Sequence, residues 1–255
     1  MIELYGMASP NVMKIAIMLE ETGREYRLVH VPILRRGGAT PEFLKLNPLG
    51  KVPVTIDPDG LGAEHPLYES AATLIYLAET YGPHLLPSAG PARWEVMKWL
   101  MVQASLAGPM LGQVNHFQLV EGQADSYAAS RYRDQAAKVY QAFNQRLETR
   151  PYLGGDSFSI ADIAMYPWTP FLKRHGFDWA DFPRLTAWRA SLDERPSIKR
   201  AFKAMHDLVA NEDERGGAST EDIDHFFGRR TSGPPLSDGV AYRNLGPFET
   251  VRLDS

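Results

Sequence analysis

The sequence predicts an α/β unit followed by an all-helical unit, and three observations support this fold class. Short apolar runs alternate with helical stripes over residues 1–82, whereas residues 90–210 show helical spacing alone. Strands that alternate with helices build a sheet covered by helices, and successive amphipathic helices pack on one another. The helical spacing then stops, so residues 211–255 are expected to form a C-terminal extension.

The α/β unit is expected to contain four short strands. Residues 2–5 and 26–31 are the first two, and the helix between them makes the pair parallel. Residues 52–56 and 66–68 are expected to form a second, antiparallel pair across a turn. The two pairs together predict a small mixed sheet.

Helices separate and follow these strands. The first is expected to be amphipathic, ending near Gly23, because its apolar residues fall at helical spacing; they are Val12, Ile15, Ala16 and Leu19. A short helix is predicted over residues 41–46. The last helix of the unit begins at Glu69-Ser70, where serine is a favoured N-cap residue.

The second unit is expected to consist of long helices. Gly108-Pro109 is predicted to kink or break one of them, because proline lacks the N–H that a helix interior needs. Ser159 and Asp162 have the spacing of a capping box, which predicts a helix from there towards Phe171.

The extension has no helical periodicity. Three phenylalanines within it, Phe226, Phe227 and Phe248, are expected to dock it onto the body of the protein or onto a second subunit. The remainder is predicted to be only partly ordered.

Composition excludes several classes of function. A net charge of -4 argues against a nucleic-acid-binding surface, and the chain has no run of about 18 apolar residues that would span a membrane. No secretory signal precedes the first strand, so a cytoplasmic protein is expected. The chain has no cysteine and its seven histidines do not lie at metal-ligand spacing, so we assign no metal and no cysteine nucleophile.

The most informative motifs predict a docking site for a peptide. Pro53 ends the segment 47–53 inside an apparent strand, where it cannot join a regular ladder. It fits a turn, with a cis bond as one option, that presents the backbone of Val52 to a ligand. Glu69 and Ser70 supply a hydroxyl and free amides suited to a carboxylate.

These motifs and the Ser159–Asp162 box resemble those of the cytosolic glutathione transferases over residues 1–209. The resemblance implies a thioredoxin-like N-terminal domain (1–82) and an all-helical C-terminal domain (90–210). Residues 9–11, 108–117 and 152–155 are similar to the bacterial Nu class and to fungal prion-type regulators of the same fold. Glutathione would then be the co-substrate, and the protein would be a homodimer.

The resemblance also assigns roles around the glutathione sulfur. Ser9, where the class usually has threonine, and Asn11 would be the catalytic pair that faces the thiolate. Helix capping is the alternative role for both residues, and Tyr5 is a rival hydroxyl. His116 and Phe117 would line the pocket of the second substrate, with core packing as the alternative.

Further residues would hold the rest of the tripeptide. Val52, fixed by Pro53, would pair with the cysteinyl backbone, and Lys51 would pair with the glycyl carboxylate unless it is merely solvated. Glu69 would take the γ-glutamyl amine and Ser70 the γ-glutamyl carboxylate. Arg131 would reach in from the helical domain, although a surface position is equally expected.

Three functions follow from the resemblance. The leading hypothesis is glutathione-dependent reduction of a disulfide together with conjugation of a small electrophile. The alternatives are glutathione-dependent cleavage of aryl ethers and a regulatory protein without enzymatic activity. A glutamine common near residues 37–38 in the class is replaced here by Ala39 and Thr40, so Arg35 or Arg36 is expected to substitute for it.

Overall fold

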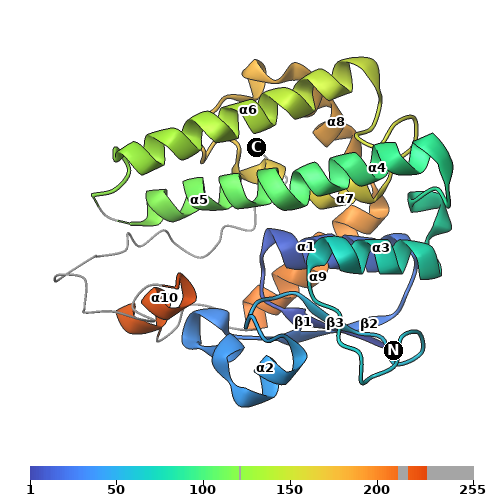
Figure 1. Cartoon of the computed structure of the whole chain (residues 1–255), viewed down its shortest axis with the longest axis vertical. Helices are drawn as coiled ribbons and strands as arrows, with labels where there is room; N and C mark the ends of the chain where they lie inside the picture. The colour runs from blue at the N-terminus through green and yellow to red at the C-terminus, as the bar shows by residue number, and fades with distance from the viewer. Residues whose placement is uncertain (121, 212–217, 229–255) are drawn as a thin grey trace.

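The computed structural model describes residues 1–120, 122–211 and 218–228. They form two lobes that lie one above the other in Figure 1. The N-terminal lobe (residues 2–85) holds the sheet, and the helical lobe (residues 90–211) contains no strand among its described residues. The predicted α/β unit followed by an all-helical unit is therefore confirmed. No helix in the described ranges is both long and apolar enough to cross a membrane.

The sheet has three strands in the order β2-β1-β3. β1 (Ile2–Gly6) pairs in parallel with β2 (Tyr26–His30) and antiparallel with β3 (Val54–Ile56). The parallel pair follows from the helix that connects its strands, because such a crossover returns the chain in the same direction.

The fourth predicted strand, at residues 66–68, is wrong. Only Leu67 pairs with the sheet, through an isolated bridge in which its N–H and C=O each bond to Thr55 at 2.8 Å. The next hydrogen-bonded pair of this antiparallel ladder would join residues 53 and 69, and Pro53 has no N–H to donate there. This sheet edge is therefore reduced to a single bridge.

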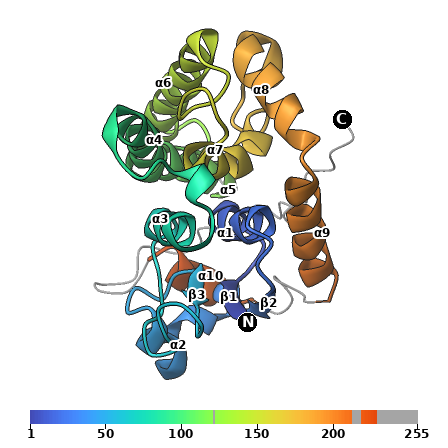
Figure 2. The same ribbon diagram turned by 90° about the vertical axis from the view of Figure 1, so that its right-hand side faces the viewer.

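Helices cover both sides of the sheet. α1 (Pro10–Glu21) and α3 (Ser70–Tyr81) lie between the sheet and the helical lobe, and α2 (Pro41–Leu46) lies on the far side (Figures 1 and 2). Short 3-10 turns η1 (Ile33–Arg35) and η2 (Gly37–Ala39) lead from β2 into α2, and η3 (Pro83–Leu85) ends the lobe.

α1 is buried on every side, so the prediction of an amphipathic helix is wrong. All eight residues from 12 to 19 are buried, including Met13, Lys14 and Met18, which lie off the predicted stripe. The sheet covers one face, and α3 and the helical lobe cover the others. A helix enclosed in this way needs apolar residues all round.

The helical lobe begins with one long helical segment that contains an internal irregularity. α4 (Gly90–Val102) passes into a π-helical turn, η4 (Gln103–Ala107), and continues as α5 (Gly108–Leu119). The prediction was a kink or a break at Gly108-Pro109, and the structure shows no break, because the helix continues through this wider turn. Gly108 N–H bonds to Gln103 O, five residues earlier, and this wider turn accommodates Pro109, which has no N–H to continue the regular helical ladder.

The remaining helices complete the lobe around a shared core. They are α6 (Tyr127–Thr149), α7 (Ile160–Met165), η5 (Tyr166–Phe171), η6 (Trp179–Asp181), α8 (Pro183–Asp193) and α9 (Pro196–Asn211). α9 runs down beside α1 (Figure 2), and one hydrophobic cluster extends from Ile2 to Met205. The domain limits 1–82, 90–210 and 211–255 stay a prediction. Within the last range, α10 (Thr220–Phe226) is a short helix that packs on η1.

The predicted capping box is confirmed and fixes the start of α7. Asp162 is fully buried, and its Oδ2 accepts hydrogen bonds from Ser159 N at 3.0 Å and Ser159 Oγ at 2.9 Å. Its Oδ1 accepts from Leu153 N and Trp188 Nε1, both at 2.9 Å. One carboxylate thus joins a loop, a helix start and α8.

We expect Asp162→Ala to lower the free energy of unfolding by about 3–5 kcal/mol, because it leaves four buried donors without an acceptor. Urea denaturation measures the loss. Asp181→Ala is a matched control, since Asp181 belongs to an exposed capping box with Asp178, and its loss should cost about 1 kcal/mol or less. Equal losses in the two variants would contradict this account of the buried carboxylate.

Candidate functional site

A cleft of about 610 Å³ lies between the two lobes. Its volume is in the range of about 300–1,000 Å³ that is usual for small-ligand sites. Its walls come from the starts of α1 and α3, from η4 and α5, from η5 and from the end of α10. Five of the predicted site residues border it, namely Asn11, Lys51, Glu69, Ser70 and His116.

The start of α1 brings Ser9 and Asn11 to this region. Ser9 is the N-cap residue, and its Oγ accepts a long hydrogen bond of 3.5 Å from Val12 N. Asn11 lies in the first turn and borders the cleft, whereas Ser9 is not among the lining residues. The free N–H groups of this turn carry partial positive charge, which favours an anion in the cleft.

Tyr5, the rival hydroxyl, lies on β1 and does not line the cleft. Its hydroxyl donates to Glu3 Oε2 at 2.7 Å. Burial and this hydrogen bond raise the pKa of Tyr5 above its ordinary value, so the phenol stays neutral. Tyr5 is therefore a poor partner for a thiolate in the cleft.

The loop before β3 is held in shape by Asn47. Its side chain donates to Lys51 O at 2.7 Å and accepts from Leu49 N at 3.0 Å. The peptide bond between Val52 and Pro53 is cis, as the turn interpretation allowed. Neither Val52 nor Pro53 is among the residues that line the cleft.

Gly38 and Gly50 let two loops of the N-terminal lobe approach closely. A Cβ added to Gly38 would lie 2.2 Å from Gly50 O, and one added to Gly50 would lie 2.6 Å from Gly38 O. Real Cβ atoms do not come so close to a carbonyl oxygen, so both positions require glycine. The contact aligns the loop that carries Lys51 with η2.

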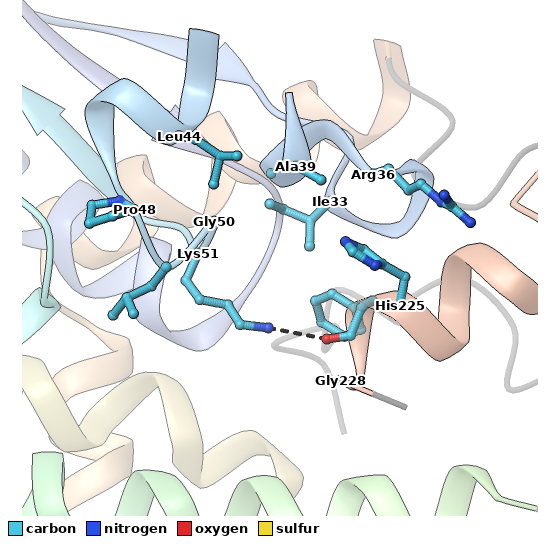
Figure 3. A pocket seen from close by; sticks show the side chains of 12 residues that line it. Ile33, Arg36, Ala39, Leu44, Pro48, Gly50, Lys51, His225 and Gly228 are labelled. Carbon is cyan, nitrogen blue, oxygen red and sulfur yellow. Dashed lines mark hydrogen bonds between the residues drawn. The ribbon is translucent and has the colours of Figure 1, made fainter. Parts of the chain in front are cut away.

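Figure 3 shows Lys51 reaching from this loop towards α10. Its Nζ donates to the backbone oxygen of Phe226 at 3.1 Å and lies 4.9 Å from the centre of the Phe226 ring. The same residues border a smaller hollow of about 340 Å³ between the loops and α10. Lys51 is thus shared between the cleft and the C-terminal helix.

Glu69 and Ser70 open α3, but their positions differ from the prediction. Glu69, not Ser70, is the N-cap residue, and Ser70 is the first residue of the helix. Glu69 has φ 66° and ψ 102°, a conformation that costs free energy for a residue with a side chain. Such strained residues cluster at ligand sites, and here the turn places both side chains beside the cleft.

The pair formed by Lys14 and Gln103 was not predicted from the sequence. Lys14 is 2% exposed, and its Nζ donates to Gln103 Oε1 at 2.6 Å and to Ser70 Oγ at 3.2 Å. Burial lowers the pKa of Lys14 to about 7, and the nearby Glu69 carboxylate partly opposes this shift. A lone lysine within the apolar run of residues 12–19 was the signal available.

The predicted residues of the helical lobe separate into two groups. His116 borders the cleft together with Trp168, whereas Phe117 stacks on Tyr132 with ring centres 5.6 Å apart. Arg131 is exposed on α6, and its guanidinium lies 5.7 Å from the Tyr132 ring. Phe117 and Arg131 are not among the residues that line the cleft.

α10 forms the outer side of the cleft. Phe226 packs on the apolar residues of η1, and the Phe227 ring lies 4.4 Å from His116, as expected for residues that dock the extension. Arg36 holds the start of α10 through Glu221 at 2.8 Å and Asp222 at 2.7 Å. Arg36 is therefore engaged by the extension, and Phe248 lies outside the described residues.

Within the described ranges, no group of three or more metal-binding side chains lies close enough together to hold an ion. The cleft instead gathers polar groups suited to an organic ion. Cationic and neutral donors come from Lys14, Ser70 and Asn11, and Glu69 supplies a carboxylate. This arrangement matches a ligand that carries both an anionic and a cationic group.

Comparison with known proteins identifies the family. The model of the glutathione S-transferase N-terminal domain matches residues 8–80, and that of the C-terminal domain matches residues 95–196. The disulfide-bond oxidoreductase YfcG of Escherichia coli is 39% identical over 204 residues, which cover 79% of this chain and 94% of the relative.

Two solved structures are similar over most of the chain. A glutathione transferase family member from Pseudomonas fluorescens, with two glutathione bound, is 36% identical, with a TM-score of 0.72 over 78% of this chain and 91% of that one. A glutathione transferase from Pseudomonas putida, with one glutathione disulfide bound per subunit, is 33% identical, with a TM-score of 0.73 over 78% and 90%. The chain belongs to the glutathione S-transferase family, with a thioredoxin-like N-terminal lobe and an all-helical C-terminal lobe.

Proposed function

We propose that this protein is a glutathione transferase of the Nu type that activates the glutathione thiolate and uses it to reduce disulfides. The observation that carries the proposal is the meeting of two helix starts in one cleft. Asn11 lies in the first turn of α1, and Glu69 and Ser70 open α3. The name of YfcG, a disulfide-bond oxidoreductase, and the disulfide bound to the Pseudomonas putida enzyme support this reaction class.

The tripeptide would lie along the N-terminal lobe with its γ-glutamyl end at α3. Glu69 would accept hydrogen bonds from the amine, and Ser70 would donate to the carboxylate. The backbone of Val52, fixed by Pro53, would pair with the cysteinyl part as an added strand does. Lys51 would reach the glycyl carboxylate, which requires it to leave or share its bond to Phe226 O.

Activation of the thiol needs only modest stabilisation of its anion. A free thiol has a pKa of about 8.5, and lowering it by about two units requires roughly 2.7 kcal/mol. A hydrogen bond to a charged group contributes about 1.5–3 kcal/mol, and a helix N-terminus contributes about 0.3–1 kcal/mol. Asn11, Ser9 and the start of α1 can together supply that amount without a dedicated base.

The reaction balances without an enzyme cysteine. The glutathione thiolate attacks one sulfur of the disulfide substrate, forms a mixed disulfide and releases one substrate thiolate, which takes a proton from solvent. A second glutathione thiolate attacks the glutathione sulfur of the mixed disulfide. This step releases the other substrate thiolate and yields glutathione disulfide, so two glutathiones are oxidised as one disulfide is reduced.

Cleavage of aryl ethers is a second candidate, favoured by one feature of the cleft. Trp168, His116 and Phe227 give it aromatic walls that suit an aromatic substrate. In that reaction the thiolate would attack the ether carbon and displace a phenolate. Conjugation of small electrophiles would use the same thiolate.

Binding and turnover test the proposal. We expect calorimetry on the ligand-free protein to show binding of both reduced glutathione and glutathione disulfide. Turnover of a small mixed disulfide should exceed turnover of an aryl β-ether, and the reverse order would favour the second candidate. Absence of heat with either form of the tripeptide would refute the whole assignment.

Substitution of Asn11 tests thiol activation. We expect Asn11→Ala to raise the pKa of bound glutathione by about one to two units, because the thiolate loses one hydrogen bond. Ultraviolet absorbance of the thiolate as a function of pH measures it. Ser9→Thr and Tyr5→Phe are controls that should leave this pKa unchanged, and a shift in Tyr5→Phe alone would assign the role to Tyr5.

Removal of residues 212–255 tests the C-terminal wall. We expect the truncated protein to accept bulkier substrates, because Phe226 and Phe227 no longer border the cleft and Lys51 loses its partner. Arg36→Ala in the full chain should change the substrate range in the same direction, since it releases Glu221 and Asp222. We also expect the protein to be a homodimer, and sedimentation measures whether the truncation changes that assembly. If the truncation changes neither the kinetics nor the sedimentation, this segment has no role in the substrate range or the dimer.

A further inference from the structure

Lys14 is a buried charge beside the cleft to which the proposed chemistry gives no role. Its side chain is 2% exposed, yet it borders the cleft next to Glu69 and Ser70. Burial of an ammonium group is costly, and an apolar side chain of similar length is often neutral or stabilising in such a place. Its position therefore needs a functional explanation.

The bond from Lys14 fixes the role of the Ser70 hydroxyl. An ammonium group has donors only, so Ser70 Oγ must accept from Lys14 Nζ at 3.2 Å. The single proton of the Ser70 hydroxyl is then left to donate elsewhere. Because Ser70 is the first residue of α3 and borders the cleft, that proton and the free N–H groups of the first turn can serve one anion.

The same reasoning orients Gln103. Its Oε1 accepts from Lys14 Nζ at 2.6 Å, so the amide nitrogen Nε2 must point away from the lysine. Gln103 is fully buried and borders the cleft, and Nε2 has no hydrogen-bond partner among the described residues. A buried donor without an acceptor is costly, and a bound carboxylate would satisfy it.

We propose that Lys14 is a positioning residue for the head group of glutathione. It directs the Ser70 hydroxyl and the Gln103 amide towards the α-carboxylate of the γ-glutamyl residue, and its charge attracts that carboxylate. Glu69 beside it takes the amine, so the four side chains complement a zwitterionic amino acid. This inference rests on the proposed function and adds a contribution from the helical lobe to the subsite.

The charges around Lys14 are consistent with this role. Glu69 is the carboxylate that acts on it, and His116 borders the same cleft from α5. Titratable groups on other elements packed against α1 are engaged with other partners. Asp162 of α7 bonds to Ser159 and Trp188, and Tyr166 of η5 bonds to Asp193. Arg200 of α9 bonds to Glu20, and Glu3 of β1 bonds to Tyr5 and Arg27.

Proton linkage gives the role a measurable signature. The pKa of Lys14 is about 7 in the free protein, and a carboxylate bound beside it raises that pKa. Binding of the head group therefore takes up a proton above pH 7. Affinity should be greatest below pH 7 and should fall as the pH rises from there towards the pKa in the complex.

The experiment is a calorimetric titration with S-methylglutathione, which has no thiol to ionise. We expect the affinity of the wild-type protein to fall about tenfold between pH 7 and pH 9. Lys14→Met should bind about 10- to 100-fold more weakly at pH 6 and lose this fall, the effect of one charge-assisted hydrogen bond. Lys14→Arg should bind well at pH 6 and should lose no more affinity at pH 9 than Lys14→Met does, because a guanidinium does not titrate and only the ligand amine changes its charge.

Controls separate the role of Lys14 from folding. Lys138→Met removes an exposed lysine on α6 and should behave as wild type. The amine of the ligand titrates equally in every variant, so it cancels from the comparison. A thermal melt of each variant shows whether it is folded at the temperature of the titration. Gln103→Leu should also weaken binding, because it removes a donor.

The outcomes distinguish this inference from the proposed function. Binding by the wild-type protein, with equal affinity and the same pH profile in Lys14→Met, would overturn the role of Lys14 and leave the glutathione site intact. Wild-type binding by Gln103→Leu would likewise overturn the proposed contribution of the Gln103 amide and leave the glutathione site intact. Failure of the wild-type protein to bind S-methylglutathione at any pH would instead overturn the proposed function itself.

Discussion

The burial of α1 on every side is the constraint on which the rest of the structure depends. The helix lies between the sheet and the helical lobe, and it contributes residues 12–19 to one core that both lobes share. Its N-terminus opens into the cleft, so the same element supplies packing at its centre and polar groups at its start. A helix packed on every side therefore borders the cleft, which suits the proposed positioning of a reactive sulfur.

The second lobe contributes to the cleft through an irregular turn. η4 widens the helix between α4 and α5 and brings Gln103 against Lys14, which lies 89 residues earlier in the chain. π-helical turns are rare and often mark functional sites, because they redirect side chains within a continuous helix. Here the turn places Gln103, a residue of a helix that packs as part of the core, at the border of the cleft.

The C-terminal segment adds a wall that is held by the packing of Phe226 and by polar contacts at its two ends. Arg36 pairs with Glu221 and Asp222, and Lys51 donates to Phe226 O. Exposed ion pairs of this kind contribute little stability and weaken in salt. Lys51 is also the residue proposed for the glycyl carboxylate, so α10 and the tripeptide compete for one ammonium group.

The sequence by itself determined the features that depend on near neighbours. The strand and helix order, the Ser159–Asp162 box, the proline turn at Pro53 and the cap at Ser9 follow from caps, turns and periodicity within a few residues. The family resemblance supplied the site residues, of which the structure brings five to the cleft.

Only the tertiary structure decided what surrounds each element. It enclosed α1 completely, reduced the fourth strand to the bridge at Leu67 and placed Phe117 and Arg131 away from the cleft. It also paired Lys14 with Gln103 and set α10 against η1. These outcomes depend on contacts between residues far apart in the chain. The local spacing of residues does not indicate which distant surface will cover a given side chain.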